Sequence, residues 1–140
     1  RLLSYSGAKM ASKFGFDFSG FIVLPIPISR KREKERGFNQ AEIIAKAVCK
    51  EFGLTMDTSI LERIRDTSKQ FGLHKAERGQ NIHGAFAVKK DPQVQKLVCG
   101  GKLLLVDDIC TTGSTLMEVS HALYNAGAKD VRCFALSRKI

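Results

Sequence analysis

Two adjacent carboxylates, followed by a turn rich in hydroxyl groups, give one segment of the chain the chemistry to hold a phosphorylated sugar. The segment reads LLLVDDICTTGST, from Leu103 to Thr115. Asp107 and Asp108 can accept hydrogen bonds from neighbouring sugar hydroxyls. The candidate phosphate ligands in the turn are Thr111, Thr112, Gly113, Ser114 and Thr115. A helix is expected to begin in this turn, and free N–H groups at a helix amino terminus favour an anion, so the segment predicts a ribose 5-phosphate site.

The element that must position the two acids is a buried strand. Leu103 to Val106 are four consecutive apolar residues, which is typical of a central parallel strand covered on both faces. Ligands of such sheets bind beyond the carboxyl ends of the strands, where Asp107 and Asp108 are expected. A strand, an acidic turn and a capped helix without any ligand is the alternative, but two adjacent acids at a strand end have no packing rationale. Neither a Walker loop nor a GxGxxG motif occurs, so a nucleoside triphosphatase or a dinucleotide-binding protein is not expected.

A run of cations follows the first predicted strand. Phe21 to Leu24 predict a buried strand, and Pro25 and Pro27 end its pairing because they lack N–H donors. The cations in the predicted loop after this strand are Arg30, Lys31, Arg32, Lys34 and Arg36. The run indicates binding of an anionic group, with a solvated loop or a basic patch for nucleic acid as the alternatives.

Three segments together carry a resemblance to a known family. The segment from Leu103 to Thr115 closely resembles the phosphoribosyl pyrophosphate (PRPP) signature of the type I phosphoribosyltransferases, although Cys110 stands where an aliphatic residue is commoner. The segments from Val23 to Glu42 and from Arg63 to Phe86 complete a pattern that resembles ComF-type competence proteins, whose carboxyl-terminal domain is such a transferase domain. The resemblance implies that the acid pair meets the ribose hydroxyls, that the turn holds the 5-phosphate, and that Mg²⁺ accompanies PRPP.

The same resemblance implies roles for the two basic segments. It makes Arg30, Lys31 and Arg36 candidate ligands of the diphosphate. It makes the second segment a flexible loop that folds over bound PRPP and excludes water, as in related transferases. The matching positions of that loop are Arg63, Arg65, Thr67, Gln70 and Arg78. An ordinary surface loop with scattered charges is the alternative.

Length and pattern predict a single domain. The chain has 140 residues, of which 44% are hydrophobic, and this suffices for one core. Alternating strands and helices predict a three-layer α/β fold, with a mostly parallel sheet flanked by helices. The resemblance implies a variable segment called the hood, which gives specificity in this fold. We expect residues 1–20 to form a short or incomplete hood and residues 21–140 to form the core. Strands are expected near Phe21, near Ile60, at Ala85–Val88, from Leu103 and at Val131–Leu136, and helices from Asn39 and from Ser114.

Composition bears on environment and partners. The apolar run 20–28 is too short to span a bilayer and no signal peptide precedes it, so a cytoplasmic protein without membrane insertion is expected. The four cysteines lie far apart and are expected to be reduced, buried packing residues. The net charge of +9 suits a nucleic acid and a phosphorylated substrate equally, and no row of exposed aromatic residues is evident for stacking bases.

The resemblance, supported by these residues, implies Mg²⁺-assisted transfer of phosphoribosyl from PRPP to an unidentified acceptor, expected to be a nitrogen nucleophile, with release of diphosphate. No residue is predicted to bind the metal ion directly. The resemblance also implies a link to competence for DNA uptake. Two alternatives remain open, a non-catalytic PRPP or nucleotide-binding regulator and an accessory protein that binds single-stranded DNA or DNA-uptake proteins. A homodimer is a further expectation.

Overall fold

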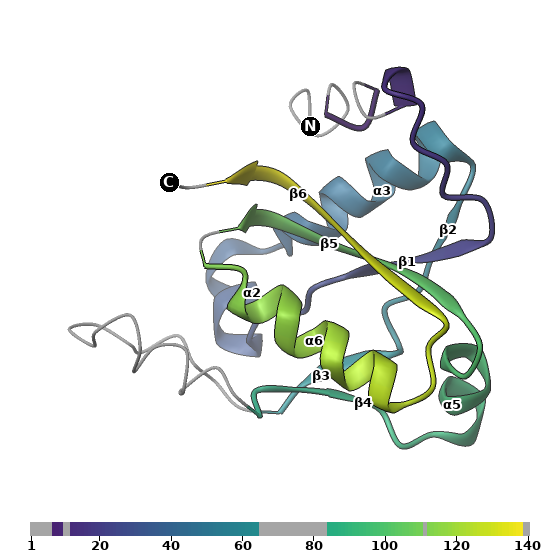
Figure 1. Ribbon diagram of the computed structural model, residues 1–140. Coiled ribbons are helices and arrows are strands. Elements are labelled where there is room, and N and C mark those ends of the chain that lie inside the picture. Colours follow the sequence, from purple (N-terminus) through teal and green to yellow (C-terminus); the bar gives the residue numbers. More distant parts are fainter. Residues whose placement is uncertain (1–6, 10–11, 65–83, 111, 139–140) are drawn as a thin grey trace.

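The computed structural model describes residues 7–9, 12–64, 84–110 and 112–138. Within these ranges strands and helices follow one another without strict alternation (Figure 1). In chain order they are β1 (Phe21–Pro25), α2 (Arg30–Arg36), α3 (Gln40–Phe52), β2 (Thr55–Met56), β3 (Leu61–Arg63), β4 (Phe86–Val88), α5 (Pro92–Val98), β5 (Lys102–Cys110), α6 (Ser114–Asn125) and β6 (Asp130–Arg138).

Four strands form a parallel sheet in the order β2-β1-β5-β6. Helix α3 covers one face, and helices α5 and α6 cover the other (Figure 1). The predicted three-layer α/β fold is therefore confirmed. The strands predicted near Ile60 and at Ala85–Val88 do not join this sheet, because β3 and β4 pair antiparallel with each other as a separate ribbon.

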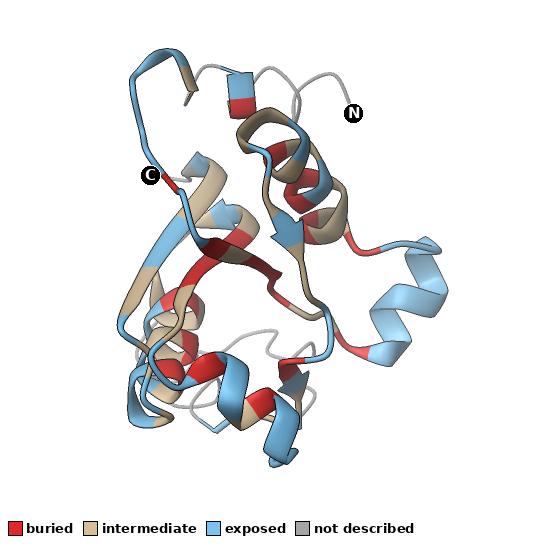
Figure 2. Cartoon of the chain, turned by 90° about the vertical axis from the view of Figure 1, so that its right-hand side faces the viewer, coloured by how far each residue is buried: buried red, intermediate tan, exposed pale blue. Residues whose placement is uncertain are grey.

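The apolar run of β5 divides between the two faces of the sheet. Leu103 and Leu105 pack in a core cluster with α5 and α6, whereas Leu104 and Val106 pack in a second cluster with α3. None of the four side chains is exposed, and the buried residues gather where the sheet meets the helices (Figure 2). This alternation explains why the strand is apolar at every position.

The basic run that was expected to be a loop is a helix. Ser29 accepts a hydrogen bond from the N–H of Arg32, and Gly37, at φ 77°, donates its N–H to the carbonyl of Glu33. Helix α2 buries none of its residues, so its two caps specify it rather than an apolar face. The helix expected from Asn39 is confirmed, since the Asn39 side chain accepts from the N–H of Ala41.

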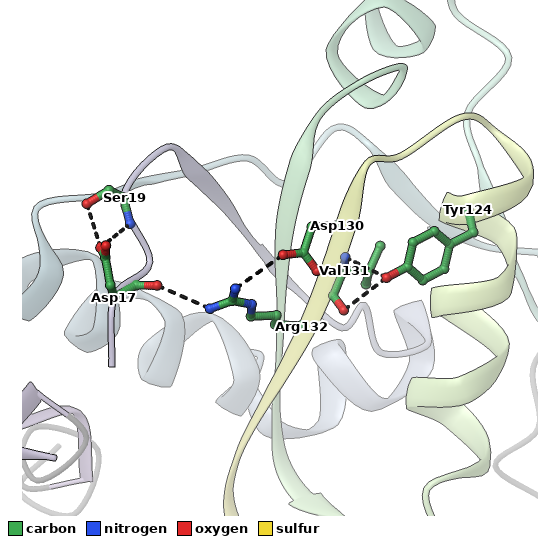
Figure 3. A network of polar contacts seen from close by, with 6 residues as sticks. All are labelled: Asp17, Ser19, Tyr124, Asp130, Val131 and Arg132. Carbon is green, nitrogen blue, oxygen red and sulfur yellow. Dashed lines mark hydrogen bonds and ion pairs between the residues drawn. The ribbon is translucent and has the colours of Figure 1, made fainter. Parts of the chain in front are cut away.

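A polar network lies at the amino ends of β5 and β6 (Figure 3). The Arg132 guanidinium is 3.3 Å from the Asp130 carboxylate and also donates to the backbone carbonyl of Asp17. The Tyr124 hydroxyl accepts a hydrogen bond from the N–H of Val131. These contacts tie residues before β1 to the sheet, and the hood assigned to residues 1–20 stays a prediction.

The four cysteines are free thiols. Cys99 and Cys133 are exposed, so the prediction of burial is wrong for these two. Cys133 is exposed because β6 is the outermost strand of the described sheet and has no strand on its other side. No helix in the described ranges is long and apolar enough to cross a membrane.

Candidate functional site

The acid pair lies where the sheet changes its winding direction. The chain passes from β1 through α3 to β2 on one side, and from β5 through α6 to β6 on the other, so β1 and β5 flank a switch point. In open α/β sheets the crevice at the carboxyl ends of two such strands is the usual ligand site. Asp107 and Asp108 occupy this place on β5.

The sequence predicted that the two acids stand at the carboxyl end of their strand. In the structure they lie within the strand. Strand β5 continues to Cys110 because β6 pairs with it along this whole stretch, with Asp107 opposite Ala135. The neighbour on the other side ends earlier. Pairing between β1 and β5 stops at Pro25 and Val106, as the prolines predicted, and the N–H of Ile26 makes one further bond to the Val106 carbonyl. Beyond this point β5 continues, with both acids, without pairing to β1.

The two carboxyl groups lie close together and are partly withdrawn from water. Asp107 accepts a hydrogen bond of 2.8 Å from the N–H of Asp108, which in turn accepts one of 2.8 Å from the N–H of Ile109. Burial, followed by the neighbouring Asp108 carboxyl, raises the pKa of Asp107 to about 7, and the positive charge of Arg63 opposes this rise. Asp107 therefore exchanges its proton near neutral pH.

The hydroxyl-rich turn leads directly into α6. Gly113 is the N-cap residue of α6 at φ 80°, a left-handed conformation that glycine adopts without strain, and it provides no side-chain cap. The Thr112 and Ser114 hydroxyls are 2.7 Å apart, and Thr112 also accepts from the N–H of Ser114. The first-turn N–H groups of a helix have no partner within it, so the turn offers donors for an anion. Thr115 lies in this first turn, and Thr111 lies outside the described residues.

An open hollow of about 480 Å³ adjoins Asp108. Its lining residues come from the ends of α2, α3, β5 and β6, and they are Arg36, Phe38, Gln40, Asp108, Ile109, Leu136 and Ser137. Of the three candidate diphosphate ligands, only Arg36 lines this hollow. Arg30 and Lys31 are exposed in the first turn of α2.

Arg63 is held in place by an aromatic ring. It ends β3, and its guanidinium carbon is 5.2 Å from the centroid of the Phe86 ring. Its charge acts on Asp107, so Arg63 lies near the acid pair. The remaining candidates of the flexible loop, Arg65, Thr67, Gln70 and Arg78, lie outside the described residues.

The sequence did not predict several residues of this region. Glu118 of α6 accepts a hydrogen bond from the N–H of Gly84, which ties the β3–β4 ribbon to the helix that carries the turn. Phe38, Leu136 and Ser137 of the hollow were also missed. Phe38 gave one signal, since it is an isolated aromatic residue between a helix-ending glycine and a helix cap, where no core face is predicted.

The donor set suits magnesium brought in by a substrate. No group of three or more His, Cys, Asp or Glu side chains that could hold a metal ion occurs in the described part of the chain. Mg²⁺ needs only one or two carboxylates when substrate phosphates and water supply its remaining oxygen ligands. Asp107 and Asp108 fit that requirement, and neither is assigned as a direct ligand.

Comparison with known proteins identifies the family and the fold of the chain. Residues 34–140 match the family model described as "Phosphoribosyl transferase domain". Among solved structures, the "allosteric regulatory enzyme of purine biosynthesis" superposes with a TM-score of 0.62, at 20% identity over 96% of this chain and 25% of that one. A hypoxanthine phosphoribosyltransferase from Staphylococcus aureus gives 0.59, at 13% identity over 98% of this chain and 64% of that one. The chain belongs to the phosphoribosyl transferase domain family and has the type I phosphoribosyltransferase fold.

Curated relatives narrow the assignment. Competence protein F of Haemophilus influenzae is 33% identical over 83% of this chain and 49% of its own length. Competence protein ComFC of Streptococcus pneumoniae is 37% identical over 81% of this chain and 46% of its own length. These relatives place the chain with the ComF-type competence proteins. The chain spans about half the length of the curated relatives it matches.

Proposed function

We propose that the chain binds PRPP at the carboxyl ends of β1 and β5 and transfers its phosphoribosyl group to an acceptor. The observation that carries this proposal is the acid pair at the switch point, with the α6 turn beside it. A carboxylate pair for vicinal hydroxyls and a helix amino terminus for a phosphate match the two ends of a ribose 5-phosphate.

Each group has a role in the proposed transfer. Asp107 and Asp108 accept hydrogen bonds from the ribose hydroxyls and stabilise positive charge that develops on the ring. The turn from Thr112 to Thr115 holds the 5-phosphate, and Arg36 stabilises the negative charge of the departing diphosphate.

The bond changes balance without an oxidant or a reductant. The bond between C1 and the diphosphate oxygen breaks, and its electron pair leaves with the oxygen. The lone pair of the acceptor nitrogen forms the new bond to C1, and the proton of that nitrogen passes to water.

Magnesium belongs to the proposal because the oxygen donors fit it. The diphosphate, the ribose hydroxyls and water would hold the ion, with Asp107 and Asp108 nearby. When bound, Mg²⁺ supplies Lewis-acid polarisation of the leaving diphosphate.

A second candidate function rests on α2. This helix exposes five cations and buries none of its residues, which favours contact with a polyanion. Several curated relatives are named "DNA utilization protein YhgH" and others are named competence proteins, so we propose single-stranded DNA as that polyanion and a link to competence. Salt-sensitive binding of a single-stranded oligonucleotide that Lys31→Ala plus Lys34→Ala weakens would support this candidate. A cytoplasmic location and a homodimer remain predictions from the sequence.

Calorimetric titration of PRPP with Mg²⁺ into the chain tests the main proposal. We expect binding in the micromolar range, about −8 kcal/mol. Release of diphosphate in the presence of an acceptor would identify a transferase, and binding without release under any acceptor would identify a PRPP-binding regulator. Absence of PRPP binding would contradict the proposal.

A further inference from the structure

We propose that the outer edge of β6 is an interface for a second copy of this chain, with the two β6 strands paired antiparallel to form one continuous sheet. This inference does not depend on the proposed function. Strand β6 pairs with β5 on one side, and no strand among the described residues pairs with its other side. An edge strand of nine residues without proline presents a row of N–H and C=O groups to which another chain can bond.

The contact of Tyr124 with β6 shows which backbone groups face this edge. The Tyr124 hydroxyl is 3.0 Å from the Val131 nitrogen and 3.5 Å from the Val131 oxygen (Figure 3). Both groups of Val131 therefore point away from β5. Because the direction alternates from residue to residue along a strand, the N–H and C=O groups of Cys133, Ala135 and Ser137 also point away from β5. Among the described residues, none bonds to these outward groups, so the edge is covered at Val131 and open from Cys133 to Ser137.

A twofold axis through Ala135 uses all of the open groups. Ala135 then stands opposite Ala135 of the second copy, and Cys133 stands opposite Ser137 of the second copy. Each opposing pair exchanges both of its N–H···O bonds, as in any antiparallel ladder. An axis through Cys133 would bring Val131 into the ladder, where the Tyr124 hydroxyl already occupies its backbone groups. The open stretch is therefore complementary to itself in one register, as a closed dimer requires.

Helix α6 places an apolar side chain at the same level as this axis. The Ser120 hydroxyl is 3.7 Å from the Cys133 sulfur, and α6 and β6 run in opposite directions. Met117 stands three residues before Ser120, about 4.5 Å along the helix. A strand covers that distance in one to two residues, which brings Met117 level with Ala135. The Met117 side chain is 61% exposed, so it is available for contact with its counterpart.

The spacing of the elements lets the two copies of α6 pack together. Helix α6 packs on β5 and β6, so its axis lies about half a strand spacing inside the edge. Across the joined sheet the two helices are then about two strand spacings apart, or about 10 Å. This is the distance between the axes of packed helices. Strand pairing and helix packing are therefore satisfied by the same arrangement.

The distribution of charge favours this surface for self-association. The net charge of +9 opposes the approach of a second copy. The groove of about 320 Å³ between α6 and β6 is lined by Met117, Tyr124 and Cys133 among others, and no Lys, Arg, Asp or Glu occurs in its described lining. Arg132 of β6 is paired with Asp130 at 3.3 Å. Two copies can therefore meet at this groove with little repulsion.

Sedimentation equilibrium of the chain tests the interface, with the monomer mass of 15.5 kDa as the reference. Two paired strands and two paired helices give an interface near the lower end of the specific size range, about 1,200 Å², so we expect a reversible dimer with a dissociation constant in the micromolar range. About 0.5 M salt should strengthen the dimer, because it screens the repulsion between the two positive chains.

Two substitutions of exposed apolar side chains locate the interface. Met117→Lys places two positive charges close to the twofold axis and should weaken the dimer by about tenfold or more. Leu97→Lys is the matched control, because Leu97 is 44% exposed on α5 and does not line the groove. It should leave dimerisation unchanged within about twofold. Both variants should unfold at the temperature of the wild type, since neither replaced side chain is buried.

A third variant, Ala135→Cys, reports the register. The Cα atoms of a hydrogen-bonded antiparallel pair are about 5.5 Å apart, which suits a disulfide. With oxidised glutathione as the oxidant, this variant should form a disulfide-linked dimer. The wild type is its control, because its exposed Cys133 stands opposite Ser137 rather than another thiol. The inference is overturned if the chain is a monomer at all concentrations, if Met117→Lys weakens the dimer no more than Leu97→Lys does, or if Ala135→Cys cross-links no faster than the wild type.

Discussion

The two sides of the acid pair differ in chemistry although they share one strand end. On the α6 side, short hydroxyl side chains bond to one another and leave helix N–H groups for an anion. On the α3 side, an open hollow combines exposed apolar side chains with one cation among its described lining residues, Arg36. The first side is suited to the fixed part of a substrate, its phosphate. Under the proposed function, the second side provides Arg36 for the diphosphate.

The difference lies in how each side is built. The turn is one continuous stretch of chain, so local sequence specifies it. The hollow is assembled from four separate elements that meet only because β6 pairs with β5 and α3 packs beneath them. We infer that substitutions outside the turn leave phosphate binding intact. Substitutions in the four elements around the hollow can therefore alter the hollow without disturbing the turn.

Removal of the shared acids should have the largest effect, because both sides depend on them. Asp107→Asn plus Asp108→Asn should weaken binding of PRPP with Mg²⁺ by roughly 100-fold or more, since each change removes hydrogen bonds to a charged acceptor. Calorimetry measures this loss. The variant should unfold at the same or a higher temperature, because the pKa of Asp107 shows that burial disfavours its charged form. Unchanged PRPP binding would refute the site.

Charge removal on α2 should distinguish Arg36, which lines the hollow, from the other cations of this helix. Arg36→Ala should weaken PRPP binding by about thirtyfold, a size expected for a charge-assisted hydrogen bond, because Arg36 lines the hollow with Asp108. Arg30→Ala removes the same charge from the first turn of α2 and should change the affinity by less than about threefold. Equal losses in the two variants would mean that the whole helix binds diphosphate, as the sequence predicted.

Acid should weaken PRPP binding through Asp107. Its pKa is raised from 3.8 to about 7, so the carboxylate that the ribose hydroxyls require forms only as the pH rises through neutrality. Affinity should therefore fall by about tenfold between about pH 8 and about pH 6. The Asp107→Asn variant binds weakly at every pH and should lose this dependence, which separates Asp107 from the titration of the PRPP phosphates.

The same pKa determines how stability changes with pH. Because the folded protein binds this proton more tightly than the unfolded chain does, the contribution of Asp107 to stability is greatest at low pH. It falls as the pH rises between about 4 and about 7. Thermal unfolding of wild type and Asp107→Asn across this range measures the difference, and parallel curves would contradict the assigned pKa.

The glycine of the turn should give the smallest change. Gly113→Ala places a side chain at φ 80°, so the turn should relax and PRPP binding should weaken by about fivefold, within the 1–2 kcal/mol cost of that conformation. Gly100→Ala is the matched control, because Gly100 has φ 74° and does not belong to the turn. Both variants should lose similar stability in thermal unfolding, but only Gly113→Ala should affect binding. Equal binding by the two would remove the turn from the phosphate site.

Helix α2 was not predicted, although the sequence contains the residues that cap its two ends. The run of cations has no apolar period, so it was expected to be a loop. Its caps, Ser29 and Gly37, nevertheless satisfy the end groups of a helix locally. The short helix α5 was also missed, although Asp91 and Pro92 stand at its start in the positions that favour a helix amino terminus. These two errors came from relying on hydrophobic period for segments that bury little.

Local interactions let the sequence alone determine much of this protein. The apolar run of β5, the prolines that end β1, the Asn39 cap and the order of acids, turn and α6 each depend on residues close together in the chain. Tertiary structure decided that Arg63 lies near Asp107, that Asp107 titrates near neutrality, and that Phe38 and Leu136 meet beside Asp108. These facts depend on which strands become neighbours and on how far water is excluded. Burial of helix and strand faces between distant segments decides both, and no local pattern of residues encodes it.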